Sequence, residues 1–377
     1  MTMATAYIPL DLHWLIFDLL EPISQINYCS ISSFLDRHLF IKNVDENKLK
    51  LDNSIITQKK FYRITKLQII SNIRNINHLI NLKILYCSPL IEQDDIKNLD
   101  LIELYARNIP NITNVNHMKN LKILDACYKS GIDQAGIENL NLKKLYAYDN
   151  NKITNVNYMV NLKILAAGGN CGIDQAGIEN LNLIELCASF NSKITNVNHM
   201  KNLVILYAKS NCGINQAGIM NLNLIELHAD SNTKIINVNH MKNLKKLYAK
   251  DTCGIDQIGI MNLNLIELYA DSNTKINNVN HMKNLKILYA KGTCGIDQIG
   301  IMNLNLFELH ADYNTKIINV NHMKKLKILY AGGTCGIDQA GIMNLNLIEL
   351  HADYNTKIIN VNHMKNLKNY MPKVLVV

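Results

Sequence analysis

Five cysteines recur at one constant interval, and their thiols could in principle form disulfides or bind a metal. They are Cys171, Cys212, Cys253, Cys294 and Cys335. If the interval spans two turns of stacked strands about 4.8 Å apart, consecutive members lie ~10 Å from each other. A disulfide needs Cα atoms within roughly 7 Å, and zinc needs its ligands closer still. With the odd total of nine cysteines, this spacing predicts buried, unpaired thiols in a reducing compartment.

Histidines at the same interval raise the question of metal binding a second time. The members are His117, His199, His240, His281, His322 and His363, with Tyr158 in the gap. Each histidine has its nearest counterpart two turns away, and no cysteine or carboxylate recurs beside it at chelating spacing. The sequence therefore predicts polar residues at an edge of the fold, with no metal and no cofactor.

The interval itself comes from a leucine repeat that sets the elements of the chain. One series is Leu121, Leu162, Leu203, Leu244, Leu285, Leu326 and Leu367; a second, placed midway between its members, is Leu142, Leu183, Leu224, Leu265, Leu306 and Leu347. Together the two series divide the chain into units that alternate between a longer and a shorter form, each of about 20 residues, which predicts a solenoid. Apolar and polar residues alternate around positions 3 to 7 of each unit, which predicts a short strand with one buried face.

Asparagines recur where each of these strands ends. They are Asn191, Asn232, Asn273, Asn314 and Asn355. A buried turn at that point leaves backbone groups unpaired, and a side-chain amide can both donate to them and accept from them. We therefore interpret this column as structural.

Positions 3, 5 and 7 of each unit point to the concave side of such a sheet. Position 5 carries Tyr105, Tyr146, Tyr207, His228, Tyr248, Tyr269, Tyr289, His310, Tyr330 and His351, interrupted by Asp125, Ala166 and Cys187. Position 7 carries Lys209, Asp230, Lys250, Asp271, Lys291 and Asp312, then Gly332 and Asp353. Position 3 carries glutamate on alternate units, from Glu185 to Glu349.

Two interpretations of this face remain open. In the first, the surface satisfies itself: lysine and aspartate on neighbouring strands pair, and the aromatic rings stack along the ladder. In the second, the position-5 residues bind a partner protein, because tyrosine is enriched in protein interfaces and histidine can join it there. A long exposed aromatic column exceeds what solubility requires, so we favour the partner interpretation.

The repeat resembles the leucine-rich repeat family over about residues 62–377. Its longer units resemble the cysteine-containing subtype through the tract Ile296-Asp-Gln-Ile-Gly300-Ile301 and its copies starting at Ile173 and Ile337. They depart from it because Thr or Asn stands at position 9 in place of cysteine, and because they are shorter. The resemblance implies an α/β solenoid, a horseshoe of about 15 units with a parallel concave sheet. We expect turns, 3₁₀ pieces or single helical turns on the convex side.

The first 45 residues do not fit the repeat and predict a small helical head. Apolar residues from Leu12 to Leu20 follow a helical spacing after Pro9, and Pro22 ends that helix. A second, shorter helical pattern follows, with Ser24 as its expected N-cap. A capping role is one interpretation, because a solenoid must cover its terminal core. Residues 46–61 are interpreted as a connector to an array over 62–377.

The head also resembles an F-box, a motif that opens with Leu-Pro and a spaced apolar series. The tract Ile8-Pro9-Leu-Asp-Leu12 carries the first half of the resemblance, and Ile26 to Phe34 the second. The resemblance implies docking on the Skp-type adaptor of a cullin ubiquitin ligase while the repeats capture a protein substrate. The docking residues carried over are Ile8, Pro9, Leu12, Ile16, Leu19, Ile23 and Ile26.

No motif for catalysis is present: the chain has no phosphate-binding glycine loop, no nucleophile elbow and no metal-ligand cluster. We therefore predict a protein-interaction adaptor that is not an enzyme. One alternative is a repeat scaffold without a ubiquitin role. Another is a polyanion binder that uses the net charge of +8 and a lysine column at Lys119, Lys201, Lys242, Lys283, Lys324 and Lys365. We favour a solvated edge over nucleic-acid binding for that column.

The location expected from the sequence is intracellular, cytoplasmic with the nucleus not excluded. No apolar stretch is long enough to span a membrane. The N-terminal segment carries Asp11, His13 and Asp18 and lacks the basic start of a signal peptide.

Overall fold

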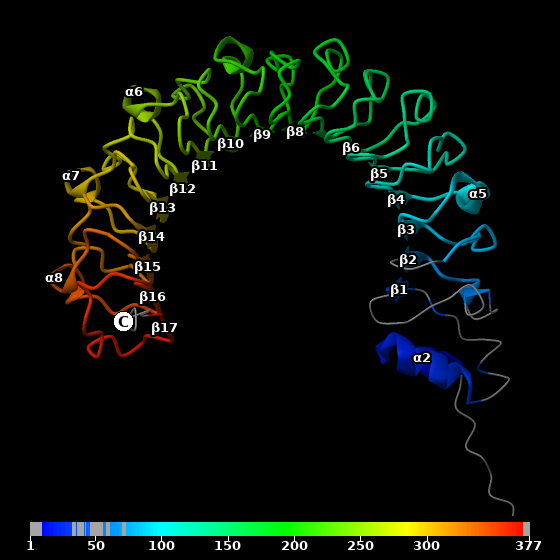
Figure 1. Ribbon diagram of the computed structural model, residues 1–377, viewed down its shortest axis with the longest axis horizontal. Helices are drawn as coiled ribbons and strands as arrows, with labels where there is room; N and C mark the ends of the chain where they lie inside the picture. The colour runs from blue at the N-terminus through cyan, green and yellow to red at the C-terminus, as the bar shows by residue number, and fades with distance from the viewer. Residues whose placement is uncertain are drawn as a thin grey trace, which may run out of the picture. The chain divides into compact units, whose positions relative to one another are not determined.

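The computed structural model describes residues 10–31, 35, 41, 43–45, 56–57, 61–69 and 73–371. It divides into two compact units, Met1–Leu181 and Asn182–Val377, each of which is described by itself. In both units short strands lie side by side along one face, and turns with short helices lie along the other (Figure 1).

The first unit begins with two helices and continues as a ladder of parallel strands. Its elements are α1 (Leu10–Leu19), α2 (Pro22–Cys29), β1 (Asn43–Asp45), β2 (Lys66–Gln68), β3 (Ile84–Tyr86), α5 (Gln93–Ile96), β4 (Glu103–Tyr105), β5 (Ile123–Asp125), β6 (Lys144–Tyr146) and β7 (Ile164–Ala166). Each strand from β1 to β7 pairs in parallel with the next, residue opposite residue.

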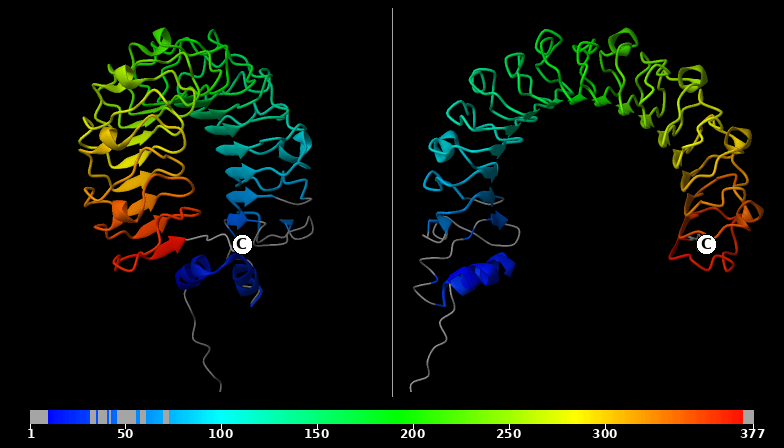
Figure 2. Two further views of the ribbon diagram at one scale, coloured as in Figure 1. Left: turned by 60° about the vertical axis from the view of Figure 1, so that its left-hand side comes forward. Right: turned by 180° about the vertical axis from the view of Figure 1, so that it is seen from behind.

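The second unit has the same kind of ladder (Figure 2). Its elements are β8 (Glu185–Cys187), β9 (Ile205–Tyr207), η2 (Ala217–Ile219), β10 (Glu226–His228), β11 (Lys246–Tyr248), α6 (Gln257–Ile260), β12 (Glu267–Tyr269), β13 (Ile287–Tyr289), α7 (Gln298–Ile301), β14 (Glu308–His310), β15 (Ile328–Tyr330), α8 (Gln339–Ile342), β16 (Glu349–His351) and β17 (Asn369–Met371). Its strands are also parallel and in register.

The leucine repeat forms the core of each unit. The middle residue of a strand, such as Leu268, is fully buried, whereas the residues on either side are partly exposed. Leu265, Ile276, Val279 and Met282 of the same turn are also buried. Burying one such side chain contributes about 1.5–3 kcal/mol, and each turn stacks its set on the next. The predicted fold class, a solenoid of repeated turns with a parallel sheet, is confirmed.

The turns opposite the strands are short, as expected for units of this length. A single helical turn or a 3₁₀ turn occupies the longer units, for example α7. Asp297 precedes α7, and its side chain accepts a hydrogen bond from the backbone NH of Gly300 at 2.8 Å. That bond satisfies one of the unpaired NH groups at a helix start.

The asparagine column works as predicted. Asn273 is fully buried, and its Nδ2 donates to the carbonyl oxygens of Ala249 at 2.8 Å and Ile255 at 3.2 Å. Its Oδ1 accepts from the backbone NH of Lys275 at 2.9 Å. The same three bonds recur at Asn232, Asn314 and Asn355.

The two N-terminal helices are joined by side-chain hydrogen bonds. Phe17 of α1 and Cys29 of α2 are buried, and Gln25 Nε2 donates to the carbonyl oxygen of Phe17 at 3.0 Å. His13 Nδ1 and the Tyr28 hydroxyl are 2.8 Å apart. The predicted N-cap at Ser24 is wrong, because α2 begins at Pro22 and contains Ser24. Proline suits the first helical position, where its missing NH has no partner to lose.

The strand ladder begins before the predicted repeat array. β1 lies inside the segment 1–45 predicted as the head and pairs with β2. At the other end, β17 follows Leu367, the last member of its leucine series, and pairs with β16. Most of the predicted connector 46–61 lies outside the described residues. Among the helices of the described residues, none is both long and apolar enough to cross a membrane.

Candidate functional site

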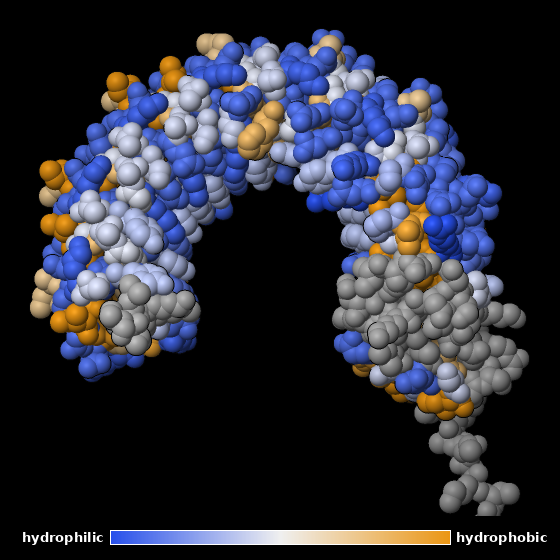
Figure 3. Space-filling model, in the orientation of Figure 1, coloured by the Kyte–Doolittle hydropathy of each residue, from blue (hydrophilic) through white to orange (hydrophobic). Residues whose placement is uncertain are grey.

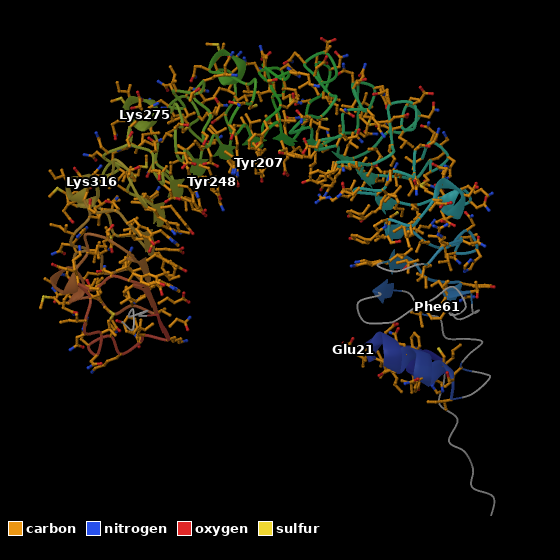
Figure 4. All side chains as sticks on the ribbon, viewed as in Figure 1. Glu21, Phe61, Tyr207, Tyr248, Lys275 and Lys316 are labelled. Carbon is orange, nitrogen blue, oxygen red and sulfur yellow. The ribbon has the colours of Figure 1, made fainter. Side chains whose placement is uncertain are left out.

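Aromatic rings stack along the solvent side of each unit's sheet. This side is formed by the first and third residues of the strands, and we call it the strand face. In the second unit the rings form one column from Tyr207 to His351, with Tyr207 and Tyr248 labelled in Figure 4. Successive ring centres are 4.2, 3.8, 4.0, 4.5, 3.7, 4.0 and 4.1 Å apart. In the first unit Tyr86 and Tyr105 stack at 4.1 Å.

Glutamates at the start of the strands bind the polar ends of these rings. Glu226 Oε1 lies 2.6 Å from His228 Nε2, and the same distance joins Glu308 to His310. Because a carboxylate only accepts, Nε2 carries the proton, and Nδ1 of both histidines is then buried without a partner. In β12 the Tyr269 hydroxyl donates to Glu267 at 3.0 Å.

Lysine and aspartate form a second row beside the ring column. Lys209, Lys250 and Lys291 each pair with the aspartate of the next turn, Asp230, Asp271 and Asp312, at 2.9, 3.1 and 3.0 Å. Their ammonium groups also lie 5.3–5.8 Å from tyrosine ring centres. The first interpretation of this face, pairing and stacking within the chain, is therefore confirmed for these residues. Partly exposed pairs of this kind contribute only ~0–1 kcal/mol each.

The exposure of the column is less than expected. The sequence predicts an exposed aromatic column, but His228 and His310 are buried, with 7% and 5% of their surface accessible. The prediction is wrong for these two because a tyrosine covers each face of their rings. The other tyrosines and the remaining histidine of position 5, including Tyr146 in β6, are half-buried. Partner binding by this column stays a prediction.

The repeated cysteines are buried, and the repeated histidines lie close to backbone carbonyl oxygens. All five repeated cysteines are buried and free, and burial raises the pKa of the Cys294 thiol to about 11. His240, His281, His322 and His363 each place Nε2 3.1–3.3 Å from a backbone carbonyl oxygen of the preceding turn. In the described part of the chain, no group of three His, Cys, Asp or Glu side chains could hold a metal ion.

Two sets of residues in this framework were not anticipated. Tyr86 belongs to the ring column, but its repeat is degenerate and the position-5 pattern does not reach it. Lys275 and Lys316, labelled in Figure 4, each donate from Nζ to the carbonyl oxygen of a cysteine one turn back, Cys253 at 3.2 Å and Cys294 at 3.0 Å. These lysines recur at the same interval as the cysteines, and that recurrence could have indicated a bond between them.

We expect the free energy of unfolding to fall as the pH drops below about 6.5, the ordinary histidine pKa. Burial lowers the pKa of His228 and His310 in the folded state, so the unfolded chain binds more protons at acid pH. Stability is then fully present above the unfolded pKa and is lost as the pH falls towards the folded pKa. Each histidine contributes a slope of at most about 1.4 kcal/mol per pH unit.

The matched variant replaces both histidines by tyrosine, which the chain already pairs with glutamate at Tyr269. Urea unfolding of the wild type and of His228→Tyr/His310→Tyr between pH 5 and 8 gives the measurement. The variant should lose most of the acid-side slope. Equal slopes in the two proteins would show that other groups cause it.

Comparisons with known proteins add context to this geometry. No protein-family model matches the chain, and no curated protein matches it. An internalin (inlF) from Listeria monocytogenes is 14% identical, with 85% of this chain and 89% of that chain covered and a TM-score of 0.34. The yeast Rad7 and Elc1 complex gives 14% identity over 97% and 98%, with a TM-score of 0.40. A leucine-rich repeat protein of Leptospira interrogans gives 14% over 84% and 87%, with a TM-score of 0.28.

Proposed function

We propose that this chain is a non-enzymatic adaptor that joins a captured protein to a ubiquitin ligase. In this proposal helices α1 and α2 dock on a Skp-type adaptor of a cullin ligase, and the strand face of the repeats holds the protein to be modified. The observation that carries the proposal is an exposed apolar face on α1.

That face consists of residues at helical spacing on one side of α1. Leu12, Ile16 and Leu19 are 50%, 39% and 81% exposed, and Leu15 beside them is 61% exposed. Positions i, i+4 and i+7 of a helix lie on one face, whereas Phe17 of the same helix is buried. Figure 3 shows hydrophobic surface at these helices. A helix that only capped the solenoid would bury its apolar face against the repeats.

The other predicted docking residues add nothing to this support. Ile8 and Pro9 lie outside the described residues, as do the side chains of Ile23 and Ile26. The proposal therefore rests on Leu12, Ile16 and Leu19, together with the resemblance of the surrounding sequence to an F-box.

Substrate capture is assigned to the strand face because that face is long and repetitive in its chemistry. Tyrosine ring edges, glutamates and lysine–aspartate pairs recur along it, and tyrosine supplies large contact area at low entropic cost. A solenoid presents such a surface on rigid strands, and its partner need only match the spacing of the turns.

Replacing Leu12 and Leu19 by alanine should weaken binding to a purified Skp-type adaptor at least tenfold. Truncating a central apolar anchor in an interface typically costs about 2 kcal/mol or more. Isothermal titration of the full chain with the adaptor gives the affinity. Circular dichroism should be unchanged, because both side chains are exposed and hold no core contact.

The matched control is Ile80→Ala/Ile359→Ala, which removes two exposed apolar side chains from the repeats. It should bind the adaptor like the wild type. Absence of adaptor binding by the folded wild-type chain would refute the ligase role and leave a repeat scaffold without a ubiquitin function.

A further inference from the structure

One turn of the second unit lacks a cation that its neighbours contain. In three earlier turns a lysine ammonium binds the aspartate of the next turn and lies against tyrosine rings. Lys291 is the nearest of these: its Nζ is 3.0 Å from Asp312 Oδ2, 5.7 Å from the Tyr289 ring centre and 5.4 Å from that of Tyr330. In these turns, position 7 of the repeat therefore holds an ammonium group between a carboxylate and aromatic rings.

Gly332 stands where the next lysine of the series Lys209, Lys250 and Lys291 would stand. Its backbone keeps the register of the repeat, because its NH donates to Asp312 Oδ1 at 2.8 Å as the NH of Lys291 donates to Asp271 at 3.0 Å. The aspartate of the following turn, Asp353, has no ion-pair partner among the residues that the structure describes. The repeat thus retains the carboxylate and lacks the ammonium.

A cavity of about 430 Å³ lies at this point. Its lining includes Asp312, Tyr330, Gly332, His351 and Asp353. Lys291 pairs with Asp312, and no cation of the described residues pairs with Asp353, so these residues give the cavity a negative charge. The floor therefore combines a carboxylate with aromatic rings, the two groups that hold the lysine ammonium in the earlier turns.

Two further tyrosines wall the cavity and distinguish this turn from the others. Tyr313 and Tyr354 are half exposed and line it, at positions where earlier turns have Ser231 and Ser272. Gly333 makes room for this wall: its φ is +61°, and a Cβ there would overlap the Tyr313 ring. The glycine pair and the tyrosine pair thus act together to widen the site and make it aromatic.

His351 also differs from its counterparts. His228 and His310 bond their glutamates at 2.6 Å, whereas His351 Nε2 is 3.7 Å from Glu349 and is buried without a hydrogen-bond partner. The last ring of the column therefore lines the cavity and has one buried nitrogen that no group of the described residues satisfies.

We propose that this cavity binds the lysine side chain of a partner protein, whose ammonium takes the place that Lys209, Lys250 and Lys291 fill in their own turns. The bound ammonium pairs with Asp353 and lies beside Tyr330, and the lysine methylenes pack between Tyr313 and Tyr354. This inference names a ligand class for the strand face and holds whether or not α1 docks on an adaptor.

The test is a titration of the ¹⁵N-labelled full chain with a Gly-Gly-Lys-Gly-Gly peptide, followed by NMR. Resonances of Gly332, Gly333 and Asp353 should shift and saturate. The same peptide with norleucine in place of lysine has the methylenes and no charge, and should bind at least tenfold more weakly. Butylammonium should bind more weakly than the lysine peptide, because it lacks the flanking backbone.

The chain offers its own matched variant, Gly332→Lys, which recreates the Lys291-Gly292 sequence of the earlier turn. Gly332 does not have a positive φ, and a Cβ there would lie 3.1 Å from both Asp312 Oδ1 and Asp353 O. These contacts are tight but need a shift of only a few tenths of an ångström, so the variant should fold. It should fill the cavity and weaken peptide binding at least tenfold. Asp353→Asn should weaken it about as much without filling the cavity, and Lys283→Ala, at an exposed edge, should leave it unchanged.

Three results would overturn the proposal. The first is equal binding of the lysine and norleucine peptides, which would make the cavity merely apolar. The second is unchanged binding by Gly332→Lys. The third is binding that appears only when Lys373 is replaced by alanine, because the chain's own lysine would then be the occupant. Lys373 stands at the next position 7 after Asp353 and lies outside the described residues. Loss of adaptor binding by the α1 variant would affect none of these measurements, so the two proposals fail separately.

Discussion

Asn273→Ala should lower the free energy of unfolding by about 4 kcal/mol, close to a third of the total for an ordinary domain. The substitution removes the side-chain partner of the buried carbonyl oxygens of Ala249 and Ile255 and of the part-buried NH of Lys275. Each unsatisfied buried group costs about 1–3 kcal/mol. Urea unfolding followed by circular dichroism measures the loss.

Asn277→Ala is the control for this prediction. Asn277 is exposed, and copies of the repeat carry isoleucine at the same place, at Ile236 and Ile318. Its replacement should change stability by less than about 0.5 kcal/mol. Hydrogen exchange should show the loss from Asn273→Ala concentrated in its own and adjacent turns, because a repeat array transmits stability between neighbours. Uniform loss along both units would contradict the nearest-neighbour account.

The sequence predicts the repeat, the strand positions and the asparagine bonds because each depends on local chemistry that recurs. Leu268 and Asn273 occupy the same environment as their copies in other turns. A role assigned correctly to a residue in one turn therefore applies to its copies in the other turns. The helix boundary at Pro22 and the strand β1 were missed for the opposite reason, since both lie in the N-terminal segment, where no pattern recurs.

The strand face is predicted less completely than the fold. Its residue types and direction follow from the period-2 pattern, but the burial of His228 depends on two rings from neighbouring turns. Likewise, the sequence alone shows Gly332 only as an interruption in the lysine and aspartate pattern of position 7. The structure shows why it matters: the Lys291 ammonium lies against Tyr330, and Asp353 has no ion-pair partner within the described part of the chain. Spacing along the chain does not reveal such a juxtaposition.

Gly300→Ala should cost about 3 kcal/mol, although Gly300 lies in a helical turn where alanine is normally favoured. A Cβ at this position would overlap the carbonyl oxygen of Asn277 in the preceding turn. The backbone has no freedom to withdraw, because the NH of Gly300 is bound to Asp297 at 2.8 Å and its carbonyl accepts from Val279 NH at 3.0 Å. Relief of the overlap must therefore break one of these bonds or separate the two turns.

Ile299→Ala separates this clash from the effect of changing helical propensity. Ile299 is the exposed neighbour of Gly300 in α7, and the copy in α8 carries Ala340. Its replacement should leave stability within about 0.5 kcal/mol of the wild type. A stable Gly300→Ala protein would mean that adjacent turns can part without loss of packing. The tract at Ile296–Ile301 would then owe its recurrence to duplication alone, whereas a large loss shows that a side chain at this glycine prevents the turns from stacking.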